Sequence, residues 1–295
     1  MGARLRDIQR RIRSVESTKK ITKAMELISA SRIMRAERRV AEARPYSEAI
    51  DRMIRDLAAT AEKLEHPLLE LKESGDDGIV VITADRGLAG AYNANALRLA
   101  ERTRRSVGDN AVTYAIGRKA ISAFRFRRIP IEAQWSGFSD RPTYDDAKQI
   151  ADKLIEDFNS GKIRSAQLVM TRFESLLVQR PDMVQILPVK QEAVEGGREF
   201  PPLFEFEPEP TELLAELLPR YVEMRIYHAL LESAASEHAA RRRAMSAATD
   251  NAEDLINNLT RVMNQARQAE ITAEIADIVG GAEALRAKAE AGISS

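Results

Sequence analysis

A glycine-containing turn after an apolar segment is the first candidate for chemistry in this sequence. The apolar run Ile79–Thr83 is typical of a buried strand, and the turn Asp85–Gly90 separates it from a segment with helical periodicity. Such a turn binds nucleotide phosphates when it carries Gly-x-x-x-x-Gly-Lys-Ser/Thr or Gly-x-Gly-x-x-Gly. Here Gly90 is followed by Ala91 and Tyr92, so neither pattern is present. The sequence therefore favours a structural turn over a nucleotide site.

The polar residues around this turn can stabilise it without a ligand. Asp85 and Arg86 can pair to brace the turn, and Asn93 and Asn95 can cap the next helix or hydrogen-bond across the turn. The segment Gly117–Lys119 begins another expected helix, and helix N-termini attract anions. No second half of an anion site accompanies it, so helix capping is the preferred interpretation.

The sequence offers no set of residues for catalysis or metal binding. The chain has no cysteine, which excludes a thiolate zinc site, a cysteine nucleophile and a disulfide scaffold. The histidines are widely spaced, and His238 is expected to be packed or hydrogen-bonded between helices rather than to bind a ligand. Asp145 and Asp146 fall in the first turn of an expected helix, where carboxylates meet the helix dipole favourably. We therefore expect no catalytic, cofactor-binding or metal-binding residue.

The middle of the chain, residues 77–190, alternates apolar segments with segments of helical periodicity. This order is typical of a Rossmann-like α/β domain with a mostly parallel sheet. The expected strands are Ile79–Thr83, Val112–Ile116, Ile129–Trp135, Ala166–Met170 and Met183–Val189. The expected helices follow the glycine turn as far as Arg104, and cover Gly117–Phe126 and Tyr144–Phe158.

Two long helices are expected at the ends of the chain, over residues 1–64 and 212–291. The first segment contains one proline, Pro45, and the second has neither proline nor glycine from Tyr221 to Val279. Globular helices average about 11–12 residues. Small and apolar residues of the second helix repeat in alternating steps of four and three, as in a coiled coil. The expected seam is Ala234, His238, Arg241, Met245, Ala248, Ala252, Leu255, Leu259, Val262, Ala266, Ala269, Ala273 and Ala276.

The N-terminal helix is the expected partner of this seam. Its spacing is set by Leu5, Ile8, Ile12 and Val15, and after the polar Thr18 and Lys19 it is resumed by Ile21, Met25 and Ile28. Both helices leave one middle domain, so we expect an antiparallel coiled coil in which facing residue numbers add to about 270 and Met25 faces Met245. Residues after about 270 then extend as a single helix. Residues 191–211 form an acidic, proline-rich connector.

Charge is unevenly distributed, although the whole chain has 45 basic and 45 acidic residues. Residues 1–44 contain thirteen lysines and arginines against five acidic residues, a net charge of +8. Such a helix is expected to dock on an acidic surface of a protein, a nucleic acid or a lipid. Nucleic acid is less favoured because no aromatic residues are interleaved to stack on bases. A nucleic-acid-associated coiled-coil protein is the alternative, and a nucleotide-binding α/β enzyme with a helical arm is a third.

Several segments resemble the gamma subunit of F-type ATP synthases, and together they span nearly the whole chain. They are Ser17–Met25, Asp85–Asn93, Glu207–Pro210, Ala247–Ala252, Ala266–Ile275 and Ile278–Ala282. The blocks in the C-terminal helix are the most specific. The sequence departs from the family at Ala89, where many members have cysteine, and the absence of cysteine excludes the redox-regulated chloroplast variant.

The resemblance implies a non-catalytic subunit, the rotor of the central stalk, which couples ion flow through a membrane ring to ATP synthesis. The implied partners are the alpha and beta subunits of a catalytic hexamer, the epsilon subunit and the c-ring, with one copy of this chain per complex and no nucleic acid or cofactor. The implied location is peripheral, on the cytoplasmic side of a bacterial cell membrane.

The resemblance also implies which residues contact partners. Arg267 and Gln268 are expected to engage a loop of one beta subunit at a time. The residues expected near the acidic lever of the beta subunit are Met25, Arg38, Arg39 and Arg241. Further hexamer contacts are expected along the tip, from Thr272, Glu274, Ile275, Ile278 and Val279. Phe204, Phe206 and Glu207 are expected to face the epsilon subunit or the ring.

Overall fold

The computed structural model describes residues 3–60, 66–108, 110–189 and 210–292. The chain forms two compact units, of which unit 1 comprises Met1–Glu26 with Met245–Ser295, and unit 2 comprises Leu27–Ala244. Two long helices, α1 (Ala3–Thr60) and α6 (Pro210–Gly292, 83 residues), each contribute to both units. Most of the predicted connector lies outside the described residues.

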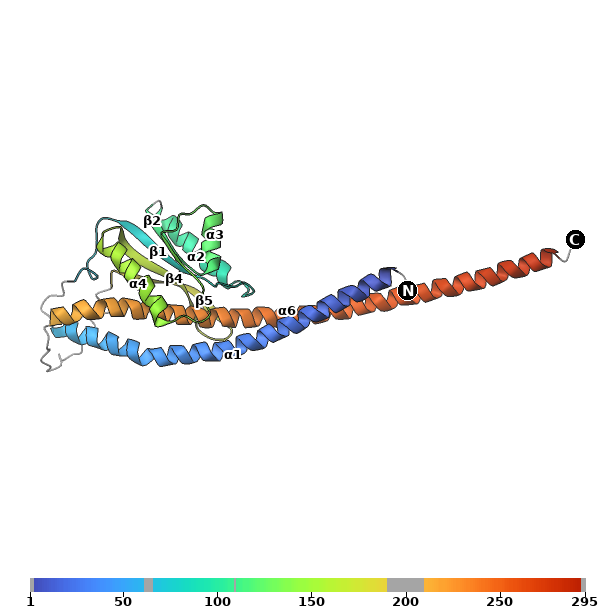
Figure 1. The fold of residues 1–295 in the computed structure, drawn as a ribbon, viewed down its shortest axis with the longest axis horizontal. Helices are drawn as coiled ribbons and strands as arrows, with labels where there is room; N and C mark the ends of the chain where they lie inside the picture. Colours follow the sequence, from blue (N-terminus) through green and yellow to red (C-terminus); the bar gives the residue numbers. More distant parts are fainter. Residues whose placement is uncertain (1–2, 61–65, 109, 190–209, 293–295) are drawn as a thin grey trace. The chain divides into compact units, whose positions relative to one another are not determined.

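In unit 1 the two long helices run antiparallel, side by side (Figure 1). The hydroxyl oxygens of Thr22 and Thr249 lie 2.8 Å apart in a buried hydrogen bond. The ammonium of Lys19 lies 3.1 Å from a carboxylate oxygen of Glu253. The residue numbers of the two pairs add to 271 and 272. The predicted antiparallel pairing, with a sum of about 270, is therefore confirmed.

The seam of α1 differs from the prediction in its middle. Ile21 and Ile28 are 58% and 53% exposed, whereas Thr22 and Ser29 are buried. The prediction that Ile21 and Ile28 lie on the seam was wrong. The three-four spacing of seam positions continues unbroken along the helix and falls on the polar residues Thr22 and Ser29 instead. Buried or half-buried positions continue at the same three-four spacing through Leu5, Ile8, Ile12, Val15, Lys19, Thr22, Glu26, Ser29, Ile33 and Ala36, and Met25 of the predicted seam is half-buried as well. The buried hydroxyl of Thr22 is tolerated because it forms a hydrogen bond with the hydroxyl of Thr249 on the partner helix.

The seam of α6 in unit 1 agrees with the predicted one at Met245, Ala248, Ala252, Leu259 and Ala266, and departs from it at the exposed Leu255, Val262, Ala269, Ala273 and Ala276. Leu255 and Val262 are 47% and 40% exposed, so placing them on the seam was wrong. The residues that follow the exposed ones, Ile256, Met263 and Glu270, are half-buried instead, and Thr260 is half-buried beside the predicted Leu259. A helix with about 3.6 residues per turn drifts toward later residues relative to a strict heptad pattern. All residues from 271 to 283 are exposed.

Unit 2 is built on a five-stranded sheet with the order β3-β2-β1-β4-β5. The strands are β1 (Asp76–Ile82), β2 (Ala111–Ile116), β3 (Ala133–Trp135), β4 (Ile163–Phe173) and β5 (Gln179–Leu187). β1 pairs in parallel with β2 and β4, and β2 pairs in parallel with β3, whereas β5 is antiparallel to β4. The predicted mostly parallel sheet is confirmed.

Helices cover both faces of this sheet (Figure 1). α2 (Tyr92–Val107) and α3 (Arg118–Phe126) pack on one face, where Ile79 and Val81 of β1 point. α4 (Tyr144–Asn159) and parts of α1 and α6 pack on the other, where Val80 and Ile82 point. The alternation follows from the two-residue period of a strand. The expected role of Asp146 is confirmed, because α4 begins with a capping box between Thr143 and Asp146.

The pairing in unit 1 can be tested with cysteines, since the chain contains none of its own. In the variant Thr22→Cys/Thr249→Cys we expect mild oxidation to form an intramolecular disulfide, because the two hydroxyl oxygens are 2.8 Å apart. The matched control is Thr22→Cys/Leu255→Cys, since Leu255 points away from the seam. A non-reducing gel measures the linked fraction, and equal linkage in both variants would contradict the observed seam.

Candidate functional site

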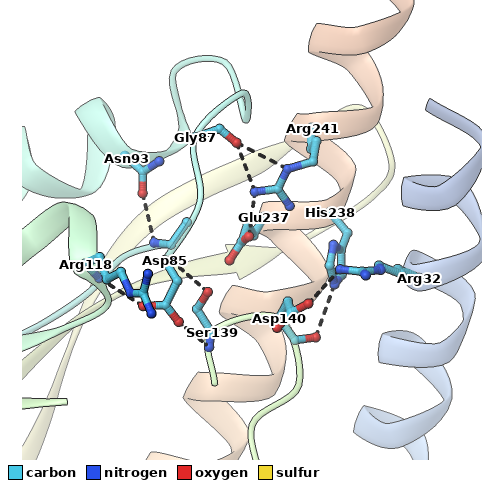
Figure 2. A network of polar contacts seen from close by, with 11 residues as sticks. Arg32, Asp85, Gly87, Asn93, Arg118, Ser139, Asp140, Glu237, His238 and Arg241 are labelled. Carbon is cyan, nitrogen blue, oxygen red and sulfur yellow. Dashed lines mark hydrogen bonds and ion pairs between the residues drawn. The ribbon is translucent and has the colours of Figure 1, made fainter. Parts of the chain in front are cut away.

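The glycine turn of unit 2 is held by contacts of Asp85 and Gly87 with other segments of the unit (Figure 2). The Asp85 carboxylate accepts hydrogen bonds from the backbone N–H groups of Arg118 (3.1 Å), Gly137 (2.8 Å) and Ser139 (3.0 Å). The backbone N–H of Asp85 donates to the Ser139 hydroxyl at 2.8 Å. Asp85 therefore braces the turn through backbone groups of other segments, in place of the predicted pairing with Arg86.

The two asparagines of this region also have internal partners. The backbone N–H of Ala84 donates to the Asn93 side chain at 2.9 Å, which confirms the predicted bond across the turn. Asn95 instead accepts from Arg98 within α2. At the start of α3, the Asp85 carboxylate occupies the place that a bound anion would take. This helix is therefore capped from within the chain, as the sequence analysis preferred.

An ion pair in α6 ties this helix to the glycine turn. Arg241 donates to the Glu237 carboxylate at 2.7 Å and to the backbone oxygen of Gly87 at 3.2 Å. Glu237 and Arg241 are only 1% and 7% exposed. Burial raises the pKa of the Glu237 carboxyl above its usual range, and the Arg241 charge opposes that effect. Removing either partner would leave a buried charge without its counter-ion.

A second set of contacts joins α1, α6 and the loop before α4 within unit 2 (Figure 2). Arg32 of α1 lies 2.6 Å from the Asp140 carboxylate. His238 of α6 is 1% exposed, and its Nε2 lies 3.3 Å from the Asp140 backbone oxygen. Burial lowers the pKa of His238 to about 4, so the imidazole is neutral at physiological pH. The prediction that His238 is a packed, hydrogen-bonding residue is confirmed.

The polar contacts of this network hold structural elements together and do not form a catalytic arrangement. Within the described ranges, no three histidine, cysteine or acidic residues gather as a metal site would require. The carboxylates of the network bond backbone N–H groups or guanidinium groups, and we find no nucleophile beside a base. The arrangement fixes the glycine turn, α6 and α1 to the same sheet domain.

The predicted contact residues occupy different environments. Arg38 and Arg39 are exposed on α1, and Arg38 donates to Glu42 at 2.8 Å. Arg241 is buried in the network described above, whereas Met25 is half-buried in unit 1. The other predicted contacts on α6 are all exposed. They are Arg267, Gln268, Thr272, Glu274, Ile275, Ile278 and Val279. Phe204, Phe206 and Glu207 lie outside the described residues.

Sequence reasoning missed the roles of Arg32, Asp140 and Glu237. The signal for Glu237 was present, since it stands four residues before Arg241, the spacing of a helical ion pair. Arg32 and Asp140 are 108 residues apart, and no local pattern links them. In the part of the chain that the structure describes, no helix is both long enough and apolar enough to cross a membrane.

We expect the Glu237–Arg241 pair to be energetically coupled. Arg241→Met should lower the free energy of unfolding of unit 2 by about 3–5 kcal/mol, because it leaves a buried carboxylate unpaired. Adding Glu237→Leu should restore most of the loss. Urea unfolding followed through Trp135, the single tryptophan, measures the change. The control Arg38→Met breaks an exposed pair and should cost less than about 1 kcal/mol. Strictly additive losses in the double variant would contradict the coupling.

Comparisons with known proteins agree with this architecture. A protein-family model described as ATP synthase matches residues 4–285. The ATP synthase gamma chain of Acidothermus cellulolyticus is 51% identical over 97% of this chain and 98% of its own length. The ATP synthase gamma chain of Thermobifida fusca is 49% identical over 97% of this chain and 98% of its own length.

Solved structures share the fold at lower identity. A chain of the Euglena gracilis mitochondrial ATP synthase rotor aligns with a TM-score of 0.67 at 19% identity, over 92% of this chain and 100% of that one. A chain from the Tetrahymena thermophila mitochondrial ATP synthase, in a structure of the central stalk and c-ring, aligns with a TM-score of 0.60 at 20% identity. The alignment covers 77% of this chain and 99% of that one.

The relatives decide between the functions that the sequence left open. They cover almost the full length of the chain at about half identity, which supports the gamma-subunit resemblance over the nucleic-acid and nucleotide-binding alternatives. The chain therefore belongs to the family of ATP synthase gamma chains, the non-catalytic rotor subunits of the central stalk of F-type ATP synthases.

Proposed function

We propose that this chain transmits torque between a membrane c-ring driven by ion flow and a catalytic hexamer of alpha and beta subunits. The observation that carries the proposal is the end of α6, where every residue from 271 to 283 is exposed. A helix that continues without a partner, yet displays Ile275, Ile278 and Val279 at 51–72% exposure, offers a surface for another protein.

The two parts of α6 in unit 1 suit different tasks. Where α6 is paired with α1, through contacts such as Thr22–Thr249, two helices resist twisting better than one. Apolar contact at Ile275, Ile278 and Val279 has little angular preference, as a bearing requires. The polar side chains of Arg267, Gln268, Thr272 and Glu274 can supply the angular preference for one beta subunit at a time.

The basic part of α1 is the proposed contact for the acidic lever of the beta subunit. Arg38 and Arg39 are exposed, and they belong to the segment with a net charge of +8. Met25 is proposed to lie near the same contact. For Arg241 we propose an indirect role, since its guanidinium is committed to Glu237 and Gly87. It would hold α6 in place rather than touch the lever.

Further partners follow from the family. The Tetrahymena chain belongs to a structure of the central stalk and c-ring, which supports a ring partner for this chain. Phe204, Phe206 and Glu207 are proposed to face the ring or the epsilon subunit. The complex would hold one copy of this chain, without nucleic acid or a cofactor on it. The chain would lie peripherally on the cytoplasmic side of a bacterial cell membrane.

Charge reversal tests the lever contact. Arg38→Glu/Arg39→Glu should reduce ATP-driven ion pumping or assembly of the complex, because attraction to an acidic surface becomes repulsion, at about 1 kcal/mol per exposed contact. Pumping in inverted membrane vesicles and subunit content of the purified complex are the measurements. The matched control is Arg98→Glu/Arg102→Glu, which makes the same charge change at exposed positions of α2. Equal pumping and assembly in the two variants would refute the contact.

A further inference from the structure

A small cavity in unit 2 is lined by more arginines than the carboxylates beside them can neutralise. Its volume is about 110 Å³, and it opens between α1, the loop before α4, and α6. The charged and polar residues that line it are Arg32, Arg35, Arg39, Asp140, Arg141 and His238. Its apolar lining consists of Ala36, Pro142, Leu231 and Ala234.

The four arginines of this cavity share a single lining carboxylate. Arg32, Arg35 and Arg39 follow one another at helical spacing on α1, and Arg141 comes from the loop. Asp140 pairs with Arg32 at 2.6 Å. Arg35 donates to the Ser31 hydroxyl at 2.9 Å. No carboxylate of the described residues lies within 4.0 Å of the guanidinium of Arg35, Arg39 or Arg141 as an ion-pair partner.

The histidine of this cavity has an unused acceptor. A backbone carbonyl only accepts hydrogen bonds, so the contact at 3.3 Å requires Nε2 of His238 to donate to Asp140. The neutral ring then has a lone pair on Nδ1. This atom is buried and has no hydrogen-bond partner among the residues that the structure describes. A buried polar atom without a partner calls for an explanation, and a ligand with a donor group would provide one.

We propose that this cavity binds inorganic phosphate, with the guanidinium groups of Arg35, Arg39 and Arg141 as donors. These three residues are exposed at the opening of the cavity that they line. Guanidinium forks match the oxygens of phosphate, and several arginines around one cavity favour an anion with more charge than a carboxylate. Phosphate near neutral pH also retains an O–H group. This group can donate a hydrogen bond to the unpaired acceptor Nδ1 of His238. The volume is well below the roughly 300–1,000 Å³ of pockets for larger ligands, so a nucleotide is not the occupant.

The phosphate site goes beyond the proposed function and does not depend on it. Arg39 belongs to both the cavity and the proposed lever contact, so phosphate and an acidic partner would compete for it. Arg38 provides an internal control, because it neighbours Arg39 in the sequence but pairs with Glu42 and does not line the cavity.

The test is a phosphate titration of the full-length chain in a low-salt, phosphate-free buffer, followed by NMR of the histidine rings. The chain has only three histidines, so each ring signal can be assigned by substitution. We expect the His238 signal to shift saturably while those of His66 and His228 stay in place. Arg39→Gln should weaken the affinity by about tenfold or more, while Arg38→Gln, which removes the same charge at the neighbouring position, leaves it unchanged. Circular dichroism verifies that both variants stay folded.

Several results would overturn the proposal. A His238 signal that does not respond in the unmodified chain excludes the site without reliance on any variant. Equal losses in Arg38→Gln and Arg39→Gln would show that net charge alone attracts the anion. Acetate binding as tightly as phosphate would show a receptor for carboxylates instead.

Discussion

The buried ion pair between Glu237 and Arg241 is the interaction on which the arrangement of unit 2 depends. Arg241 also bonds the backbone of Gly87, so one guanidinium connects α6 to the glycine turn at the end of β1. Asp85 in the same turn fixes the start of α3 and the loop at Gly137 and Ser139. A turn that elsewhere serves to hold a phosphate is thus used here to fasten a long helix to a sheet.

This use of polar groups explains how a non-catalytic subunit can serve an enzyme complex. Both long helices take part in the two units, so the helices that pair in unit 1 are the same ones that the polar contacts hold to the sheet in unit 2. Buried charges resist displacement because an unpaired charge inside the protein is costly. Exposed groups, such as the end of α6 and the basic surface of α1, remain for partners.

The sequence predicted what depends on local pattern and missed what depends on distant partners. Apolar runs located β1 and β2, and helical spacing with chain direction predicted the antiparallel pairing. Ile21 and Thr22 show the limit: apolarity placed the isoleucine inside, but the hydroxyl of Thr249, 227 residues away, makes the threonine the buried residue. Leu255 shows that a strict heptad count drifts on a real helix. The Arg32–Asp140 pair has no sequence signature at all.

The central claim is that the chain turns inside a hexamer, and the absence of native cysteine permits a direct measurement. Single cysteines at Met25→Cys or Ile275→Cys are each linked by oxidation to a cysteine placed opposite on an alpha or beta subunit, and multi-turnover ATPase is measured before and after reduction. The account predicts strong, reductant-reversible inhibition by the Met25 link, where two helices are paired. It predicts weaker inhibition at Ile275, where a single helix can swivel. Full activity with both links verified on a gel would contradict rotation.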